Sequence, residues 1–139
     1  MLLGFLFMKT STNNQAQQKI NHGAAFRMGD NVLEKWDCSP AEKQAILGLS
    51  KACYYRFQND NDKSKFSNDQ LERLSYIANI HQSLRIVFSN PDNVYGFMGM
   101  KNDNPYFNGR TPLSLIATGN FGTLYEVFKR IDAMRNGQW

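Results

Sequence analysis

The side chains that catalyse reactions in most enzymes are few in this sequence and are spaced too widely to act together. The 139-residue chain has two histidines and two cysteines, and their spacing fits neither a metal site nor a nucleophile beside its base. These four residues are His22, His81, Cys38 and Cys53. Gly119-Asn-Phe-Gly122 is too short for a phosphate-binding loop. We therefore expect that the protein is not an enzyme and uses no cofactor or metal.

A short stretch around Gly48 has side chains suited to contacting nucleic acid. A helix that ends at Gly48, followed by Ser50 as the cap of a second helix, is typical of a helix-turn-helix. The second helix would direct Lys51, Tyr55 and Arg56 outward, where phosphates or base edges lie. The formal net charge of +4 is compatible with DNA binding without demanding it. We predict that Ser50, Lys51, Tyr55 and Arg56 contact DNA; the alternative is an ordinary helical hairpin with solvated basic residues.

A second stretch, residues 104–119, combines turn-forming and helix-capping residues. Asn108-Gly109 supplies a turn with positive φ, and the guanidinium of Arg110 can bond nearby carbonyls or a carboxylate. Thr111-Pro112 begins a helix that Gly119 ends. The motif consists of Asn104, Pro105, Gly109, Arg110, Thr111, Pro112 and Gly119. From residue types alone, the stretch is a structural turn in which Arg110 acts as a clamp.

The same stretch resembles the toxin-binding domain of the Xre/MbcA/ParS antitoxin family. The family pattern has Asn-Pro, an aromatic residue, Gly-Arg-[Ser/Thr]-Pro-Leu and then Thr-Gly, which residues 104–105, 107, 109–113 and 118–119 match. The resemblance covers about residues 30–139 and is most specific from Leu84 onward. Phe97 is a departure, because tryptophan is expected at this point ahead of the Asn-Pro pair.

The resemblance implies an antitoxin that binds and inhibits a toxin encoded by the adjacent gene. Such toxins are commonly RES-domain enzymes that destroy NAD, or related ADP-ribosyl-transferring enzymes, and the antitoxin's C-terminal helix and tail cover the active-site entrance. The corresponding tail here is Arg135, Asn136, Gly137, Gln138 and Trp139. Arginine and tryptophan are enriched at binding hot spots, although a chain end can also fray without a partner.

Helix-start signals recur along the chain and indicate an all-α fold. Ser39-Pro-Ala-Glu42 and Ser67-Asn-Asp-Gln70 have the pattern of capping boxes. The apolar spacing from residue 70 to 88 predicts one long amphipathic helix. Further helices are predicted from residues 91, 112 and about 120. We expect an N-terminal helix-turn-helix-like unit followed by a C-terminal helical toxin-binding unit.

Composition divides the chain into three expected parts. Residues 1–22 form a disordered or loosely ordered tail, residues 23–65 the helix-turn-helix-like domain and residues 66–139 the toxin-binding domain, with the polar stretch 59–65 as linker. The apolar segment 1–8 is too short to cross a bilayer and lacks the basic leader and cleavage site of a signal peptide. We expect a cytoplasmic protein without membrane association.

Two functions of different classes remain open at this point. The first is an antitoxin that inhibits its toxin, represses its own operon by binding operator DNA and forms a homodimer through the long helix. The second is a stand-alone helix-turn-helix transcriptional regulator. Gln44 weighs against DNA reading, since a small residue is usual four positions before the turn glycine. Removing residues 135–139 would abolish the first function only, whereas Lys51→Ala with Arg56→Ala would abolish the second.

Overall fold

The computed structural model describes residues 20–59 and 63–137 of the chain, and every regular element within these residues is a helix. The elements are α2 (His22–Lys35), α3 (Pro40–Leu47), α4 (Lys51–Asn59), α5 (Asn68–Val87), α6 (Pro91–Gly96), the 3-10 helix η2 (Phe97–Gly99), α7 (Pro112–Ile116) and α8 (Phe121–Met134). The predicted all-α fold is confirmed. None of the described helices is long and apolar enough to cross a membrane.

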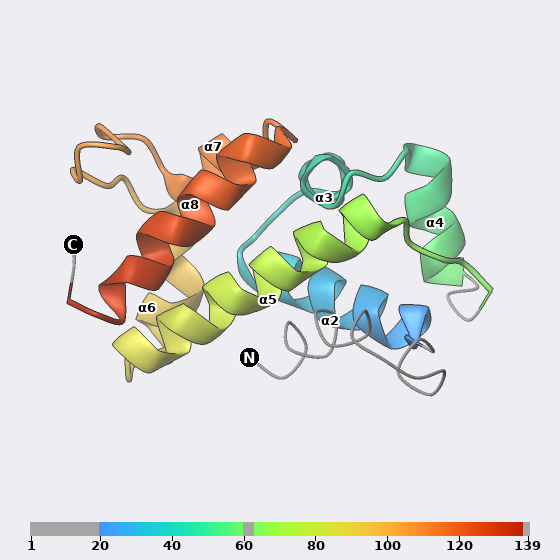
Figure 1. The fold of residues 1–139 in the computed structure, drawn as a ribbon, viewed down its shortest axis with the longest axis horizontal. Helices are drawn as coiled ribbons and strands as arrows, with labels where there is room; N and C mark the ends of the chain where they lie inside the picture. Colours follow the sequence, from blue (N-terminus) through green and yellow to red (C-terminus); the bar gives the residue numbers. More distant parts are fainter. Residues whose placement is uncertain (1–19, 60–62, 138–139) are drawn as a thin grey trace.

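The central element is α5, which runs through the molecule and contacts helices from both halves of the chain (Figure 1). In the view of Figure 1, α2 packs below α5 and α8 packs above it. Helix α4 lies at one end of the long axis, and α3 lies between it and the middle of the molecule; this region is called here the α3–α4 end. At the opposite end lie α6, the loop that precedes α7 and the last turn of α8.

The predicted starts of the helices are confirmed by their caps. Ser67 Oγ accepts from Gln70 N at 3.2 Å, and Gln70 Oε1 accepts from Ser67 N at 2.8 Å, so α5 begins with a complete capping box. An equivalent box formed by Ser39 and Glu42 begins α3. Side chains that accept a backbone N–H also cap α6, α7 and α8; they belong to Asn90, Thr111 and Asn120.

The long helix differs from its prediction because it is not amphipathic in the ordinary sense. Polar side chains on α5 are buried beside the expected apolar ones; they belong to Arg73, Ser75, Asn79 and Ser83. The reason is that α2 and α8 cover different sides of the helix, so little of its surface remains for solvent. The apolar spacing indicated the helix correctly but did not show how many neighbours it has.

Helix α2 was not predicted, although its signals are present in the sequence. Asn21 Oδ1 caps it by accepting from Ala24 N at 2.9 Å. Its buried residues lie mostly three or four positions apart and are Gly23, Ala25, Phe26, Gly29, Val32 and Leu33. A β-carbon at Gly29 would collide with Leu74 Cδ2, so the glycine permits the close contact between α2 and α5.

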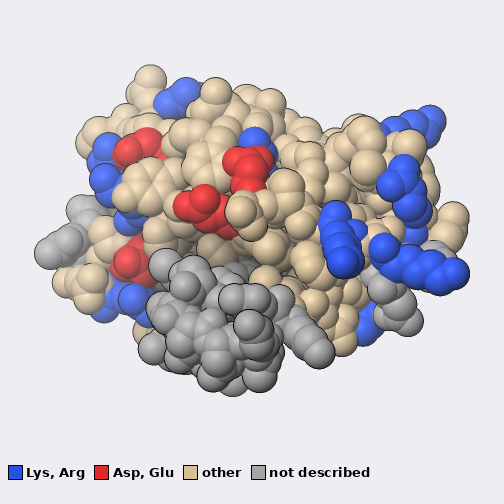
Figure 2. All heavy atoms as spheres, turned by 45° about the vertical axis from the view of Figure 1, so that its right-hand side comes forward, with Lys and Arg blue, Asp and Glu red and all other residues tan. Residues whose placement is uncertain are grey.

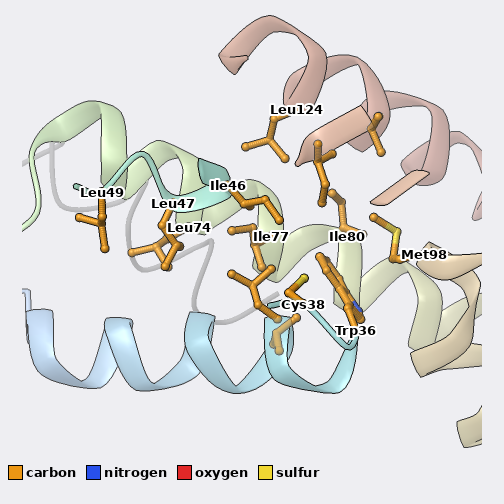
Figure 3. Packing of buried hydrophobic residues seen from close by; sticks show 14 of the residues in the cluster. Trp36, Cys38, Ile46, Leu47, Leu49, Leu74, Ile77, Ile80, Met98 and Leu124 are labelled. Carbon is orange, nitrogen blue, oxygen red and sulfur yellow. The ribbon is translucent and has the colours of Figure 1, made fainter. Parts of the chain in front are cut away.

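One hydrophobic core joins all of these elements. Trp36, just after α2, packs with residues of α3, α5 and η2, among them Ile46, Ile80 and Met98 (Figure 3). The same cluster continues to Ile131 on α8. The N-terminal and C-terminal helices therefore share one continuous core, which holds the two ends of the molecule in a fixed relative position. The division between residues 65 and 66 stays a prediction.

Candidate functional site

The predicted turn at Gly48 is present and has the geometry of a helix-turn-helix. Gly48 ends α3 with φ 70° and ψ 32°, the left-handed conformation that glycine adopts at least cost. Ser50 Oγ then accepts from Cys53 N at 3.1 Å and caps α4, as the sequence indicated. A short turn between two capped helices therefore presents α4 as the second, outer helix.

The exposed side of α4 carries the residues predicted to contact DNA. Lys51, Tyr55 and Arg56 are exposed, whereas Tyr54 and Phe57 point into the core and are buried. Ser50 is exposed at the start of the helix, but its hydroxyl oxygen is already used in the cap. The structure thus brings these four residues to one surface, and their contact with DNA stays a prediction.

A partly buried polar network links α4 to α2 and α3. Lys43 Nζ on α3 donates to Glu34 Oε1 at 2.6 Å and lies 3.2 Å from Asp30 Oδ1, both on α2. Tyr54 OH on α4 donates to the same Asp30 Oδ1 at 2.8 Å. Burial opposes the charge of Lys43, but the hydrogen bonds that it donates to the two carboxylates outweigh this effect and raise its pKa. Burial and then the bond to Asp30 raise the pKa of Tyr54 to about 12.

Sequence reasoning missed this network, although the residues carry a detectable signal. Asp30 and Glu34 are four residues apart and so lie on the same side of α2. The position of Lys43 opposite them depends on how α3 packs across α2, which short-range spacing does not determine. Since the lysine is buried and paired, it is not available to a DNA phosphate.

Basic side chains predominate around the α3–α4 end. Lys51, Arg56, Lys63 and Lys65 lie in this part of the chain, and its two aspartates, Asp60 and Asp62, lie outside the described residues. Figure 2 shows Lys and Arg gathered at this end of the molecule, with Asp and Glu nearer its middle. A cationic surface of this kind attracts phosphates without reading sequence.

At the opposite end, the motif of residues 104–119 forms a closed loop. Gly109 N donates to Asn102 O at 2.7 Å, and Asn102 N donates to Arg110 O at 3.2 Å, which joins the two ends of the loop. Phe107 lies inside and is fully buried. Asn104 accepts from the backbone N–H of Phe107 and of Asn108 through its carbonyl oxygen. The loop is therefore held by its own backbone and anchored by one aromatic ring.

Arg110 acts as the clamp that its position indicated. Its Nε donates to Phe107 O at 2.8 Å and its Nη2 donates to Tyr106 O at 2.6 Å. The preceding turn has positive φ at Asn108 (50°) and Gly109 (83°), as predicted. Pro105 is exposed at the start of the turn, and Pro112 is buried in the first position of α7 behind the cap of Thr111. These motif residues lie together and stabilise the loop.

The C-terminal tail begins as an exposed turn after α8. Arg135 Nε forms an ion pair with Asp132 Oδ1 at 3.0 Å, and Asn136 and Gly137 are exposed. Gly137 has φ 71°, the conformation expected after a helix end. Gln138 and Trp139, the other two residues predicted to bind the toxin, lie outside the described residues.

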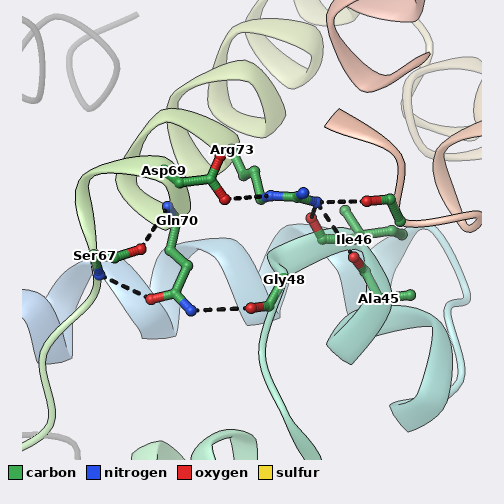
Figure 4. Close-up of polar contacts among 8 residues, drawn as sticks. Ala45, Ile46, Gly48, Ser67, Asp69, Gln70 and Arg73 are labelled. Carbon is green, nitrogen blue, oxygen red and sulfur yellow. Dashed lines mark hydrogen bonds and ion pairs between the residues drawn. The ribbon is translucent and has the colours of Figure 1, made fainter. Parts of the chain in front are cut away.

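Arg73 on α5 bridges α3 and the turn between α7 and α8 (Figure 4). Its Nη1 donates to Gly119 O at 3.0 Å, next to α7, and to Ile46 O at 3.3 Å, near the end of α3. Its Nε pairs with Asp69 Oδ2 at 3.1 Å. Gly119 (φ 81°) lies so close to α3 that a β-carbon would be 3.2 Å from Ala45 O. The last glycine of the motif therefore touches the helix-turn-helix directly.

The residues considered for catalysis are not assembled into a site. Cys38 is buried, and burial followed by the charge of Glu42 raises the pKa of its thiol to about 12, which suppresses the reactive thiolate. His81 is half-buried and stacks on Tyr95 with ring centroids 5.9 Å apart. Burial, then the charges of Arg85 and Lys35, lower its pKa. Among residues 20–59 and 63–137, no three His, Cys, Asp or Glu side chains group as metal ligands would. The absence of enzymatic activity stays a prediction.

Comparison with known proteins gives two consecutive family matches. Residues 15–79 match the antitoxin Xre-like helix-turn-helix domain, and residues 83–137 match the antitoxin Xre/MbcA/ParS C-terminal toxin-binding domain. The chain is also 27% identical over 115 residues to "Uncharacterized protein y4oB" of Sinorhizobium fredii, covering 82% of this chain and 83% of that protein. No solved structure gives a significant match. The first match contains the helix-turn-helix, and the second contains the loop, α8 and the start of the tail. The chain belongs to the Xre/MbcA/ParS family of antitoxins.

Proposed function

We propose that this antitoxin inhibits its cognate toxin by placing residues Arg135–Trp139 over the entrance of the toxin's active site. The observation that carries the proposal is the exposed turn Arg135–Gly137, which ends α8 inside the toxin-binding match and at the far end of the molecule from α4. The helix holds the start of the tail in place, because Asp132 pairs with Arg135. A partner that docks on α8 therefore meets the tail in a defined position.

The toxin is proposed to be an NAD-consuming or ADP-ribosylating enzyme. An active site that binds NAD accepts phosphate groups, and arginine bonds such oxygens through several N–H donors at once. Only the Nε of Arg135 is used in the ion pair with Asp132 that the structure records, so the outer N–H groups can face a partner. The tail would then occupy the site that the cofactor's phosphates need.

We also propose that α4 binds operator DNA and that the antitoxin represses its own operon. The support is the exposed set Lys51, Tyr55 and Arg56 on the outer helix of a well-formed helix-turn-helix. A homodimer would bring two such helices to two half-sites. Most apolar side chains of α5 are buried by α2 and α8, but Ile86 near its C-terminal end is 54% exposed, so a homodimer contact through this helix stays part of the proposal.

Co-expression with the toxin tests the proposal. The full chain should restore growth of cells that express the toxin from the adjacent gene and should co-purify with it, whereas a chain ending at Met134 should not restore growth. Lys51→Ala with Arg56→Ala is the matched control, because it removes two exposed basic residues at the other end and should leave rescue intact. Full rescue without the tail would contradict the proposed mechanism. Absence of any complex would favour the stand-alone regulator.

A further inference from the structure

Four aromatic rings meet at the surface where α5 and α8 pack together. They belong to Tyr76 on α5 and to Phe121, Tyr125 and Phe128 on α8, and are called here the α5/α8 aromatic patch. The ring of Tyr76 is the hub: its centroid lies 5.1 Å from Phe128, 5.5 Å from Tyr125 and 5.8 Å from Phe121. Tyr125 is 41% exposed and the other three side chains are partly exposed.

Other residues form the main contact between α8 and the core. The core side of this helix is formed by Leu124, Val127 and Ile131, which are almost completely buried. The aromatic residues lie beside that side and cover its margin, with part of each ring left in solvent. A contiguous set of exposed aromatic side chains on a small protein usually marks a surface that binds another molecule.

Interactions at both edges hold the rings in fixed positions. Tyr76 OH donates to Glu72 Oε2 at 3.2 Å, and the guanidinium of Arg73 lies 5.4 Å from the centroid of Phe121. Lys129 Nζ lies 5.5 Å from the centroid of Tyr125. Rings that are already ordered lose little conformational freedom on binding, which favours a tight contact.

The spacing of the rings leads directly to the C-terminal tail. Phe121, Tyr125, Phe128, Asp132 and Arg135 follow one another at four- and three-residue intervals, so they form one stripe along α8. The stripe is about 21 Å long at 1.5 Å per residue. Three of the four rings, with the start of the tail, lie inside the toxin-binding match. A single partner can therefore cover the patch and the tail together.

The charges around the patch favour a protein over nucleic acid. Glu72 accepts from Tyr76 within the patch, and Glu126 pairs with Arg130 at 3.7 Å on the next turn. Lys129 and Arg130 supply positive charges beside them, so the patch carries charges of both signs rather than the uniformly basic surface that a phosphate backbone favours. Among the described residues, Lys129 has no carboxylate partner, and it can pair with an acidic side chain of the docked protein.

We propose that the α5/α8 aromatic patch is a second docking surface for the toxin, separate from the inhibitory tail. It takes a toxin surface that presents an apolar side chain to the rings with a carboxylate facing Lys129. This inference rests on the proposed function, since it assigns the patch to the same partner. The patch supplies affinity and the tail supplies inhibition.

Binding of the full-length antitoxin to the purified toxin, measured by calorimetry, tests this assignment. Tyr125→Ser should weaken binding about tenfold or more, as expected for an aromatic residue at the centre of a contact. Tyr125→Phe keeps the ring and should bind like the wild type. Tyr55→Ser is the matched control, because Tyr55 is similarly exposed (38%) but lies on α4. Thermal unfolding of each variant checks that the fold is retained.

The outcomes separate this proposal from the proposed inhibition by the tail. If Tyr125→Ser binds the toxin with unchanged affinity, the patch is not a toxin surface. If it leaves that affinity unchanged and converts a dimer into a monomer in light scattering, the occupant is a second copy, and the proposal is also overturned. If Tyr125→Ser weakens binding while removal of residues 135–139 leaves inhibition intact, the patch stands and the tail mechanism fails. A wild-type chain that does not bind the toxin refutes both.

Discussion

The α3–α4 end and the α8 end of this antitoxin expose different chemistry and are stabilised in different ways. At the first, exposed side chains are basic and polar, and a buried network centred on Lys43 and Asp30 sets the position of α4. At the second, exposed rings lie over an apolar helix contact, and a loop is anchored by the buried ring of Phe107. Contacts made by charge weaken steeply with salt, whereas contacts made by buried rings do so much less. The partners of the two ends should therefore differ in salt dependence.

The largest effect on stability is expected at Arg73, which bridges α3 and the turn between α7 and α8. Arg73→Ala removes bonds to carbonyls of both α3 and the 104–119 motif and should lower the free energy of unfolding by about 3 kcal/mol, because hydrogen bonds to charged groups contribute most when buried. Urea denaturation measures the change. Arg85→Ala removes an exposed arginine from the same helix and should change stability by less than about 0.5 kcal/mol. If both substitutions change the free energy of unfolding equally, the bonds of Arg73 do not stabilise the contact between α3 and the 104–119 motif.

The next effect concerns the α3–α4 end alone. Lys51→Ala with Arg56→Ala should weaken operator binding by roughly ten- to a hundredfold. The variant should also show a shallower dependence of affinity on salt concentration, because a protein with fewer phosphate contacts releases fewer counterions from DNA when it binds. Fluorescence anisotropy at several salt concentrations measures both quantities. Toxin binding by the same variant should not change. An unaltered salt slope would mean that these two residues do not contact phosphates.

A smaller effect is expected inside the network that positions α4. Tyr54→Phe keeps the buried ring but removes the hydroxyl that donates to Asp30, and it should lower the free energy of unfolding by about 1 kcal/mol. Operator affinity should also fall, since α4 loses its bond to α2. Tyr55→Phe removes an exposed hydroxyl from the neighbouring position and serves as the control. If Tyr54→Phe leaves operator affinity intact, packing alone orients the helix.

The smallest effect is a pH dependence of stability at His22. His22 Nδ1 accepts from Phe66 N at 3.0 Å, which requires a neutral ring, and burial followed by the charge of Lys65 lowers its pKa below 6.5. As pH falls below 6.5, the unfolded chain takes up the proton first, so stability should decrease between about pH 7 and pH 5. Urea denaturation at both values should show a smaller decrease for His22→Gln than for the wild type. His81, whose pKa is also lowered, contributes in the same direction and remains in both proteins.

Features that depend on neighbouring residues in the chain were predictable from the sequence. The capping boxes at Ser39 and Ser67, the turn at Gly48 and the clamp formed by Arg110 all involve partners a few residues away. The exposure of Lys51, Tyr55 and Arg56 was also predicted, while their role in binding stays a prediction. Local spacing determines each of these features, and the family resemblance added the partner.

Features that depend on how distant segments pack were not predictable. Arg73 reads as an ordinary charged residue of a helix, and its bond to Gly119 O spans 46 residues of sequence. Tyr76 became part of a surface only because α8 returns across α5. The same return buries much of α5, while the dimer expected through this helix stays a prediction. No spacing rule within one helix contains this information.

The separation of the two ends is tested most directly by measuring toxin inhibition and operator affinity in the same two variants. One variant lacks residues 135–139, and the other carries Lys51→Ala with Arg56→Ala. We predict a crossed result, in which the first loses inhibition but binds the operator normally and the second binds the operator weakly but inhibits the toxin fully. Loss of operator binding on removal of the tail, with inhibition retained, would contradict the account.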